Sequence, residues 1–403
     1  MATCVVSLGA GFLLKAQCAT SAGWDGRQYE RLCYNDIQAL YEPREVEERF
    51  PYVEGRLDGR ELAQGAIEYP VLTGTFMWVA AQFASDFNGY LYASSILLAP
   101  FGLLTAYLLA RMSGARALLW AAAPAVVLYA FHNWDLLVVA AAAGGIYLWH
   151  RDRPAGAAVV FGVGGALKLF PLFLLLPLCL EVWMRRGVRD GGRVMAAGVG
   201  TFAAINLPFV IASPSGWWAT YEFHGLRTGN FDSIWYLGWP SAAPETINLI
   251  TAGLVGTFFV GVTAYGWARA RREGVFPFLQ VGAALIASFM LWNKVHSPQY
   301  TLWILPFFVL LGVRLVWWFA YTVVDMMVYV GVFRWFFDFL YRDQDFTFAK
   351  KMMFAGVWGR AALLALLVIV FLRSRPSFVS GRPRGAELAS IGPTEGVNVT
   401  PFP

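Results

Sequence analysis

Apolar runs of about 17–25 residues, the length that a helix needs to cross a hydrocarbon layer, recur along most of the chain. Short polar segments, many of them containing arginine, separate these runs. The pattern predicts an all-α, polytopic integral membrane protein with about twelve transmembrane helices. We expect spans near residues 2–18, 92–111, 116–131, 134–149, 155–168, 169–184, 193–212, 246–268, 276–293, 301–315, 316–338 and 353–372.

The composition excludes a soluble domain of this size. Hydrophobic residues make up 58% of the 403 residues and charged residues 14%, with a mean hydropathy of +0.53. Soluble domains carry about 25% charged residues. The net charge of +5 does not indicate nucleic-acid binding, because the arginines cluster in short loops between the spans.

The basic residues divide unequally between the two sets of loops. The positive-inside rule puts the richer set in the cytoplasm, with both termini, and the poorer set outside. The cytoplasmic set is Arg111, Arg116, Arg151, Arg153, Arg185, Arg186, Arg189, Arg193, Arg269, Arg271, Arg272, Arg314, Arg373, Arg375, Arg382 and Arg384. The short loops of the outer set hold only Lys168, Arg227, Lys294, Arg342, Lys350 and Lys351.

The two ends of the chain differ in character. Residues 1–19 lack a small-residue cleavage site, so we interpret them as a retained first span and not a signal peptide. This run is short for a span, and whether the true start lies upstream is left open. Residues 374–403 are polar, which predicts a disordered cytoplasmic tail after a transmembrane domain of residues 1–373. The glycosylation sequon at Asn398 has no meaning on that side.

A long acidic segment, about residues 20–91, forms the first outer loop in this topology. The apolar stretch Val71–Phe83 lies within it, and both of its ends must be outside. We therefore expect a juxtamembrane or re-entrant helix there, with Pro70 in its first turn.

Two of the four cysteines lie near the start of this loop. A disulfide between Cys18 and Cys33 is chemically allowed on the outer side and would hold Asp36 close to the membrane, and two free thiols are the alternative. Cys4 and Cys179 lie in apolar runs, where we expect them to pack as small apolar residues.

Asn293–Tyr300 is a polar cluster between two apolar runs, and it contains Lys294, His296 and Gln299. A lysine at the centre of a bilayer costs about 2.5–3.5 kcal/mol unless an anion compensates it. Because a lipid phosphate is the most available anion in such a place, the cluster predicts a site for a phosphorylated lipid.

Lys168 interrupts a second apolar stretch, which is long enough for two short spans with the lysine at their outer turn. A snorkelling lysine at a helix end is the alternative to a phosphate or catalytic contact. Asp135 falls on the same face, where it could orient a neighbour or belong to the site.

The loop of residues 214–245 supplies two further candidates. His224 and Arg227 are spaced to share a helical face, and arginine suits bidentate contact with phosphate. The aromatic residues around them are typical of an interfacial belt. Farther along, Asp325, Arg334 and Arg360 are expected to form a buried structural pair or triad.

Four short motifs, ordered along the chain and on one side of the membrane, resemble those of polyprenol-phosphate-dependent GT-C glycosyltransferases. They are Cys33-Tyr34-Asn35-Asp36, Glu68-Tyr69-Pro70-Val71-Leu72, Lys168-Leu169-Phe170-Pro171 and the Asn293–Tyr300 run. Over most of residues 1–330 the chain looks like glycosyltransferase family 87 of actinobacteria, which includes polyprenyl-phosphate-mannose α-1,2-mannosyltransferases. That family more often has Tyr-Pro-Pro at the position of Tyr69-Pro70-Val71, a difference that we expect to alter a helix start and not the chemistry.

The resemblance implies a GT-C-like domain that moves a sugar from a polyprenyl-phosphate donor to a lipid or glycan acceptor on the extracytoplasmic face. Mannose is the sugar that this resemblance favours. It gives an aspartate of the first outer loop, here Asp36, the role of base for the acceptor hydroxyl, with Asp58 and Glu68 as substitutes. Preorganised cations would neutralise the departing phosphate. The candidates are Lys168, Arg227, Lys294 and His296, with Asp135, His224 and Gln299 as possible further members of the site.

Direct displacement from a β-linked donor would invert the anomeric centre. We expect no cofactor and no metal, because basic side chains can neutralise a single phosphate; calcium on the acidic loop is the weaker alternative. Membrane lipids are expected partners and nucleic acid is not.

Three other functions stay open. An arabinofuranosyltransferase would use the same kind of donor, and a lipid-linked sugar transporter or flippase would also bind phosphate. A transporter should show repeated halves and charges near the midplane, whereas the charges here gather on one face. A structural subunit would not need Asp36, Lys168 and His296 on one side.

Overall fold

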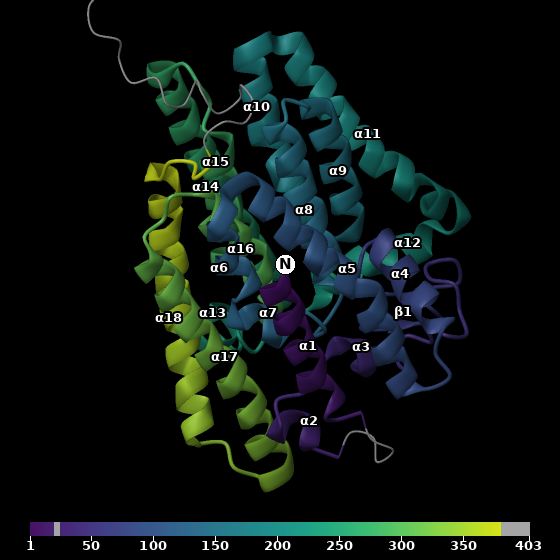
Figure 1. Ribbon diagram of the computed structural model, residues 1–403. Coiled ribbons are helices and arrows are strands. Elements are labelled where there is room, and N and C mark those ends of the chain that lie inside the picture. Colours follow the sequence, from purple (N-terminus) through teal and green to yellow (C-terminus); the bar gives the residue numbers. More distant parts are fainter. Residues whose placement is uncertain (20–24, 380–403) are drawn as a thin grey trace, which may run out of the picture.

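The computed structural model describes residues 1–19 and 25–379 of the chain (Figure 1). Helices dominate the described residues, whose one sheet is a hairpin of β1 (Arg56–Asp58) and β2 (Glu61–Ala63). The prediction of an all-α polytopic membrane protein is confirmed, because several described helices are long and apolar enough to cross a membrane. The hairpin was not predicted.

The long helices supply the candidate spans. They are α5 (Phe87–Ser113), α11 (Val188–Ala212), α14 (Pro244–Glu273), α17 (Leu315–Arg342) and α18 (Phe348–Arg373). Shorter helices, most of them apolar, are α1 (Ala2–Ala16), α4 (Val71–Ala81), α8 (Asp135–His150), α9 (Pro154–Leu167), α10 (Leu175–Arg186), α15 (Phe278–Trp292) and α16 (Thr301–Leu310).

The remaining helical segments connect these elements or lie in the loops. They are α2 (Arg27–Glu30), α3 (Asp36–Ala39), η1 (Gly114–Ala117), α6 (Leu118–Ala121), α7 (Pro124–Tyr129), η2 (Phe170–Leu174), α12 (Pro214–Leu226), α13 (Ile234–Gly238) and η3 (Pro298–Tyr300).

The span expected near residues 116–131 is not one helix. It is divided into η1, α6 and α7, with a break before Pro124. A proline has no N–H to donate and pushes the preceding residue out of the helical region. Ala123 accordingly is extended, with φ −68° and ψ 131°.

The stretch of residues 155–184 does divide into two short helices as predicted. Lys168 follows α9 with an extended backbone, and η2 then leads into α10. Pro171 lies in the first turn of η2, where its missing N–H costs nothing. The predicted turn at Lys168 is therefore confirmed.

The centre of the molecule is formed by helices that are apolar on all sides. Every residue of α16 is buried, as are nearly all residues of α15, which agrees with the rule that a helix without a polar face lies inside. By contrast, only 17% of the most apolar 18-residue stretch of α11 is buried, and the same fraction holds for α14. That exposure suits contact with lipid.

α17 and α18 pack side by side, as Figure 1 shows at the yellow-green end of the chain. Gly331 and Gly356 allow this close approach. A Cβ on Gly331 would lie 2.5 Å from the backbone nitrogen of Met353, and one on Gly356 would lie 2.8 Å from that of Val328. Small residues at such crossings are typical of helix pairs in membranes.

The first loop contains α2, α3, the β-hairpin and the predicted apolar helix, which is α4. Pro70 is the N-cap of α4 and so lies just before its first turn. The Cys18–Cys33 disulfide is present, and Cys4 and Cys179 are free and buried, which confirms both cysteine predictions.

The first part of the predicted tail packs against the helix ends. The backbone N–H of Ser377 donates to the carbonyl oxygen of Leu310 at 2.8 Å, and that of Val379 to Met112 at 3.0 Å. The ordered chain therefore continues past residue 373. Asn398 and the rest of the predicted tail, residues 380–403, lie outside the described residues.

Candidate functional site

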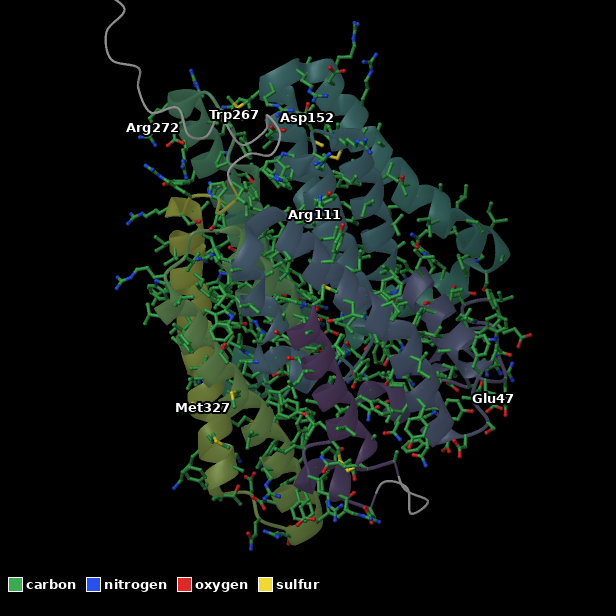
Figure 2. All side chains as sticks on the ribbon, viewed as in Figure 1. Glu47, Arg111, Asp152, Trp267, Arg272 and Met327 are labelled. Carbon is green, nitrogen blue, oxygen red and sulfur yellow. A yellow bond between two sulfur atoms is a disulfide. The ribbon has the colours of Figure 1, made fainter. Side chains whose placement is uncertain are left out.

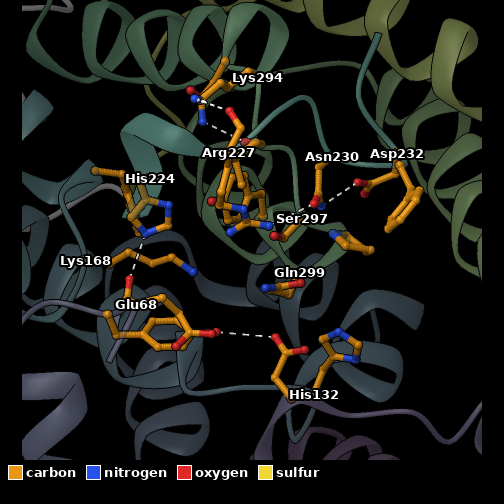
Figure 3. A pocket seen from close by; sticks show the side chains of 18 of the residues that line it. Glu68, His132, Lys168, His224, Arg227, Asn230, Asp232, Lys294, Ser297 and Gln299 are labelled. Carbon is orange, nitrogen blue, oxygen red and sulfur yellow. Dashed lines mark hydrogen bonds between the residues drawn. The ribbon is translucent and has the colours of Figure 1, made fainter. Parts of the chain in front are cut away.

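A cavity of about 710 Å³ lies where the first loop meets the helix ends (Figure 3). Its walls come from the first loop, the turn after α9, the loop after α12, the segment between α15 and η3, and α17. Seven of the ten residues predicted for the site line it, although they are scattered over 264 positions of sequence between the first and last of them; these are Asp36, Glu68, Lys168, His224, Arg227, Lys294 and Gln299.

Asp36 is held by its backbone at the start of α3. Asn35 caps this helix by accepting a hydrogen bond from the N–H of Gln38 at 2.8 Å, so Asp36 itself is not the cap. The backbone N–H of Asp36 donates to the carbonyl oxygen of His132 at 2.7 Å, and the Tyr69 hydroxyl donates weakly to Asp36 Oδ2 at 3.4 Å. Burial, with a smaller contribution from Glu68, raises the pKa of Asp36 to about 6. Its carboxylate can therefore accept a proton near neutral pH.

The positive charge of Lys168 is already balanced by the carboxylate of Asp135. Its Nζ donates to Asp135 Oδ1 at 2.6 Å, and it also lies over the rings of Tyr69, Tyr300 and Trp303 at 5.4, 4.9 and 5.1 Å. Asp135, at the start of α8, is buried and does not line the cavity. Its second oxygen accepts from Trp303 Nε1 at 2.8 Å, so it orients Lys168.

Arg227 and Lys294 have no carboxylate within ion-pair distance among the described residues. Lys294 Nζ donates to the backbone oxygen of Arg227 at 2.6 Å, and Arg227 donates to the side-chain oxygen of Asn230 at 3.1 Å (Figure 3). Desolvation, and then the neighbouring charge of Arg227, lower the pKa of Lys294 to about 8. Two uncompensated cations therefore lie at one wall of the cavity.

The prediction that His224 and Arg227 share a helical face is wrong. α12 ends at Leu226, and Arg227 follows with an extended backbone at φ −72° and ψ 146°. Both side chains nevertheless line the cavity.

His224 is a neutral donor. Its Nε2 lies 2.8 Å from the carbonyl oxygen of Glu68, and burial lowers its pKa to about 4. The Glu68 carboxylate forms an ion pair with Arg44 at 2.6 Å, with side-chain exposures of 14% and 11%. Because Glu68 is engaged in this pair, it is less suited than Asp36 to act as a base.

Besides Asp135, two predicted site residues do not line the cavity. Asp58 is exposed on the β-hairpin. His296 is buried, with Nδ1 2.8 Å from the carbonyl oxygen of Met290, and it faces a small separate hollow beside Arg360. The structure therefore does not bring His296 to the cations that line the main cavity.

Of the predicted pair or triad of Asp325, Arg334 and Arg360, the triad is wrong because Arg334 is exposed, whereas Asp325 and Arg360 are both buried and interact electrostatically without a direct ion pair. Arg360 donates to the backbone oxygen of Asp232 at 2.6 Å and lies 3.5 Å from its carboxylate. Asp325 accepts from the Thr301 hydroxyl, and Arg334 donates to the carbonyl oxygen of Glu30. Sequence spacing cannot identify such partners, because each lies on a distant element.

Sequence reasoning missed several residues at the cavity wall, which are His132, Tyr69, Asn230 and Asp232. His132 stands three residues before Asp135 in the same polar segment, and this adjacency was the available signal. Asn230 was visible in the loop after α12. Nothing in the sequence shows that it accepts from Arg227, donates to Asp232 at 3.0 Å and gives its N–H to Lys294 O at 2.9 Å.

Fold and site together define a polytopic helical membrane protein with a cavity that combines Asp36, a carboxylate of raised pKa, with two cations that have no ion-pair partner among the described residues. The chain matches no protein-family model. It is 28% identical over 244 residues to GPI mannosyltransferase 1 of Eremothecium gossypii, an alignment that covers 55% of this chain and 58% of that relative. The chain thus spans less than two thirds of the relative's length.

Proposed function

We propose that this protein is a membrane mannosyltransferase that uses a polyprenyl-phosphate-linked sugar as donor and belongs with the GT-C enzymes of the family 87 type. The distant similarity to GPI mannosyltransferase 1 supports the reaction class. The observation that carries the proposal is that Asp36 lines the same cavity as Arg227 and Lys294. A base and a site for an anion are the two groups that sugar transfer from a lipid phosphate needs.

In the proposed reaction the acceptor hydroxyl attacks the anomeric carbon of the donor sugar. The bond between this carbon and the phosphate oxygen breaks, and the electron pair leaves with the polyprenyl phosphate. Asp36 takes the hydroxyl proton, as a general base within a partly enclosed site. With a β-linked donor this single displacement inverts the anomeric centre.

Arg227 and Lys294 would bind the phosphate before and after the bond breaks. Their charges are held in place by backbone and amide contacts, so little reorganisation is needed when negative charge develops on the leaving group. Lys168 has a different role in this scheme. Because it is paired with Asp135, it contributes a fixed hydrogen-bond donor and stacked rings and little net charge.

The cavity also offers apolar surface for the lipid part of the donor. Leu169, Phe170 and Phe289 line it, and Leu169 is 41% exposed. An isoprenoid chain can lie along such side chains, because burying its methylene groups is favourable.

We place the cavity at the extracytoplasmic face and both termini in the cytoplasm. Figure 2 shows Arg272 and Asp152 at one end of the molecule, with Glu47 of the acidic first loop toward the other. The concentration of arginine in the loops at the first end favours the cytoplasm for that end.

The test is mannose transfer by membranes that contain the protein, supplied with radiolabelled polyprenyl-phosphate mannose and a lipid extract as acceptor. Asp36→Asn should reduce transfer by at least about 100-fold, the usual contribution of a general base. Asp58→Asn, a matched change on the exposed hairpin, should retain full transfer.

Two results would overturn the proposal. One is an unchanged rate in Asp36→Asn, which removes Asp36 from the mechanism. The other is a wild-type protein that transfers no sugar from any polyprenyl phosphate. Polyprenyl-phosphate arabinose, tested in parallel, decides between the two sugars.

A further inference from the structure

Lys15 is a buried cation that has no assigned role. It lies in the last turn of α1 and has no exposed surface. Its Nζ donates to the carbonyl oxygen of Tyr34 at 2.8 Å and to the Tyr329 hydroxyl at 2.9 Å, and it lies 3.4 Å from His132 Nδ1. It forms no ion pair with a carboxylate among the described residues. Burying a charge is unfavourable unless hydrogen bonds or an opposite charge compensate it.

The contacts of Lys15 converge on the short segment that carries Asp36. Tyr34, whose carbonyl Lys15 holds, is two residues before Asp36, and Tyr329 donates in turn to the carbonyl oxygen of Leu32 at 2.6 Å. The disulfide of Cys33 fixes the same segment to the end of α1. Together these contacts immobilise the backbone on the approach to Asp36.

His132 joins Lys15 to Asp36 from the other side. Its carbonyl oxygen accepts from the N–H of Asp36 at 2.7 Å, and its ring faces Lys15. Burial and the charge of Lys15 lower the pKa of His132 well below its ordinary value. His132 is therefore neutral, so that its Nδ1 can accept from the ammonium group.

Charge also links Lys15 to Asp36. Asp36 is the carboxylate that interacts electrostatically with the Lys15 ammonium. The other ionisable or polar groups that face Asp36 partly cancel one another, since two are acidic and one is basic; they are Glu68, Asp135 and Lys168, with Tyr34 and Tyr69. Lys168 is itself neutralised by Asp135. Lys168 is the cation that acts most strongly on Asp36, and Lys15 adds a second positive charge on the segment that carries it.

We propose that Lys15 is a positioning residue for Asp36: its amino group holds the backbone that carries this carboxyl group and brings a second basic group close to it. This inference rests on the proposed function, because it deepens the role of Asp36 as base. Lys15 does not itself line the cavity and would not touch substrate.

The experiment separates the two effects with three variants. Lys15→Gln keeps a hydrogen-bond donor and loses the charge, Lys15→Met loses both, and Lys15→Arg keeps both. The turnover number is measured from pH 5 to 9 for the full-length protein. Lys351→Gln, on the exposed surface of α18, is the matched control.

The acid limb is the fall of the turnover number at low pH, where Asp36 becomes protonated. Lys15→Gln should move this limb up by roughly 0.5–1 pH unit, because it removes a positive charge that favours the ionised carboxylate. Lys15→Arg and Lys351→Gln should leave the limb in place. Lys15→Met should show the same shift with a further loss of turnover. A merely structural role for Lys15 would lower turnover without moving the limb, and that outcome in Lys15→Gln overturns the proposal.

A second measurement does not depend on activity. The melting temperatures of the wild type, Lys15→Gln, Asp36→Asn and the double variant at pH 6.5 form a double-mutant cycle. Non-additive changes support the link between the two residues even if no sugar is transferred, in which case only the proposed function fails. Additive changes together with an unmoved acid limb reject the link while leaving a transferase intact.

Discussion

Lys168 and Asp135 form a buried ion pair of 2.6 Å that joins the turn after α9 to the start of α8. The pair is enclosed, with side-chain exposures of 14% and 2%, and Trp303 of α16 completes it by donating to the second oxygen of Asp135. Three elements distant in sequence therefore meet at one carboxylate. Loss of the Asp135 carboxylate should therefore affect the stability of the fold more than the chemistry.

Asp135→Ala should strongly destabilise the protein, because it leaves Lys168 buried without a counter-charge. Breaking a buried pair from one side costs about 3–5 kcal/mol. Thermal unfolding in detergent should show this loss, whereas Asp190→Ala at the surface should change the melting temperature little. Adding Lys168→Met to Asp135→Ala should recover part of the stability, since no unpaired charge remains. A double variant no more stable than Asp135→Ala would contradict this account.

The pH dependence of transfer should be bell-shaped. Asp36 has a pKa raised to about 6, so it is protonated and inactive as a base below that value. Lys294 has a pKa lowered to about 8, so its charge is lost as the pH rises through that value. The turnover number should therefore fall on the acid side and the donor KM should rise on the alkaline side. Initial rates at several donor concentrations, each from pH 5 to 9, separate the two limbs.

Bound donor phosphate should shift the alkaline limb, which is the rise of the donor KM at high pH, to higher pH. An anion beside Lys294 favours the charged form, so saturating donor should move that limb to higher pH. Lys294→Arg, which stays charged throughout, should remove the alkaline rise in the donor KM. An alkaline limb that persists in this variant would assign it to another group.

The sequence predicts the membrane class and the turn at Lys168 because both depend on local composition. Apolar length identifies spans without knowledge of their neighbours, and a lysine followed by Pro171 marks a break by local rules alone. Lys168, Arg227 and Lys294 were also recognisable, since charged residues between the later apolar runs are few. Asp36 was singled out among the acidic residues of the first loop only by the resemblance to the GT-C enzymes. The cavity does bring these four residues together.

What the sequence does not predict is how charges pair across distant elements. Nothing near Arg360 in sequence shows that Asp232, 128 positions earlier, accepts from it. His296 stands two residues after Lys294 in the same polar segment, yet its ring contacts the carbonyl oxygen of Met290 and faces a separate hollow. Arg227 lies beyond the end of α12, because the helix ends at Leu226. The sequence did not predict this helix end. These outcomes depend on tertiary packing.

The Cys18–Cys33 disulfide should stabilise the first loop and the position of Asp36. It closes a loop with a sequence separation of 15 residues, and for a loop of that size chain entropy gives about 3 kcal/mol. Cys18→Ser with Cys33→Ser should lower the melting temperature and reduce turnover, while the donor KM changes less because Arg227 and Lys294 lie on other elements. Cys179→Ser is the control, since that thiol is free. Mass spectrometry of unreduced peptides that shows two free thiols in the active protein would contradict the bridge.

Arg227 and Lys294 should govern donor binding more than acceptor binding, because they are the cations of the cavity that have no carboxylate partner among the described residues. Hydrogen bonds to charged groups contribute about 1.5–3 kcal/mol, so Arg227→Gln and Lys294→Gln should each raise the donor KM by roughly 10- to 100-fold. Arg227→Lys should recover only part of the loss, since an ammonium group cannot reproduce bidentate contact with phosphate.

The matched control for these two variants is Arg189→Gln, an exposed arginine of α11. It should leave both Michaelis constants unchanged. His296→Ala is a further comparison, because His296 lies outside the main cavity and should affect stability and not the donor KM. Steady-state kinetics with donor and acceptor varied separately distinguish these cases. If Arg227→Gln and Lys294→Gln raise the donor and acceptor constants equally, the two cations do not face the phosphate, and the anion-binding wall of the cavity must be sought among other residues.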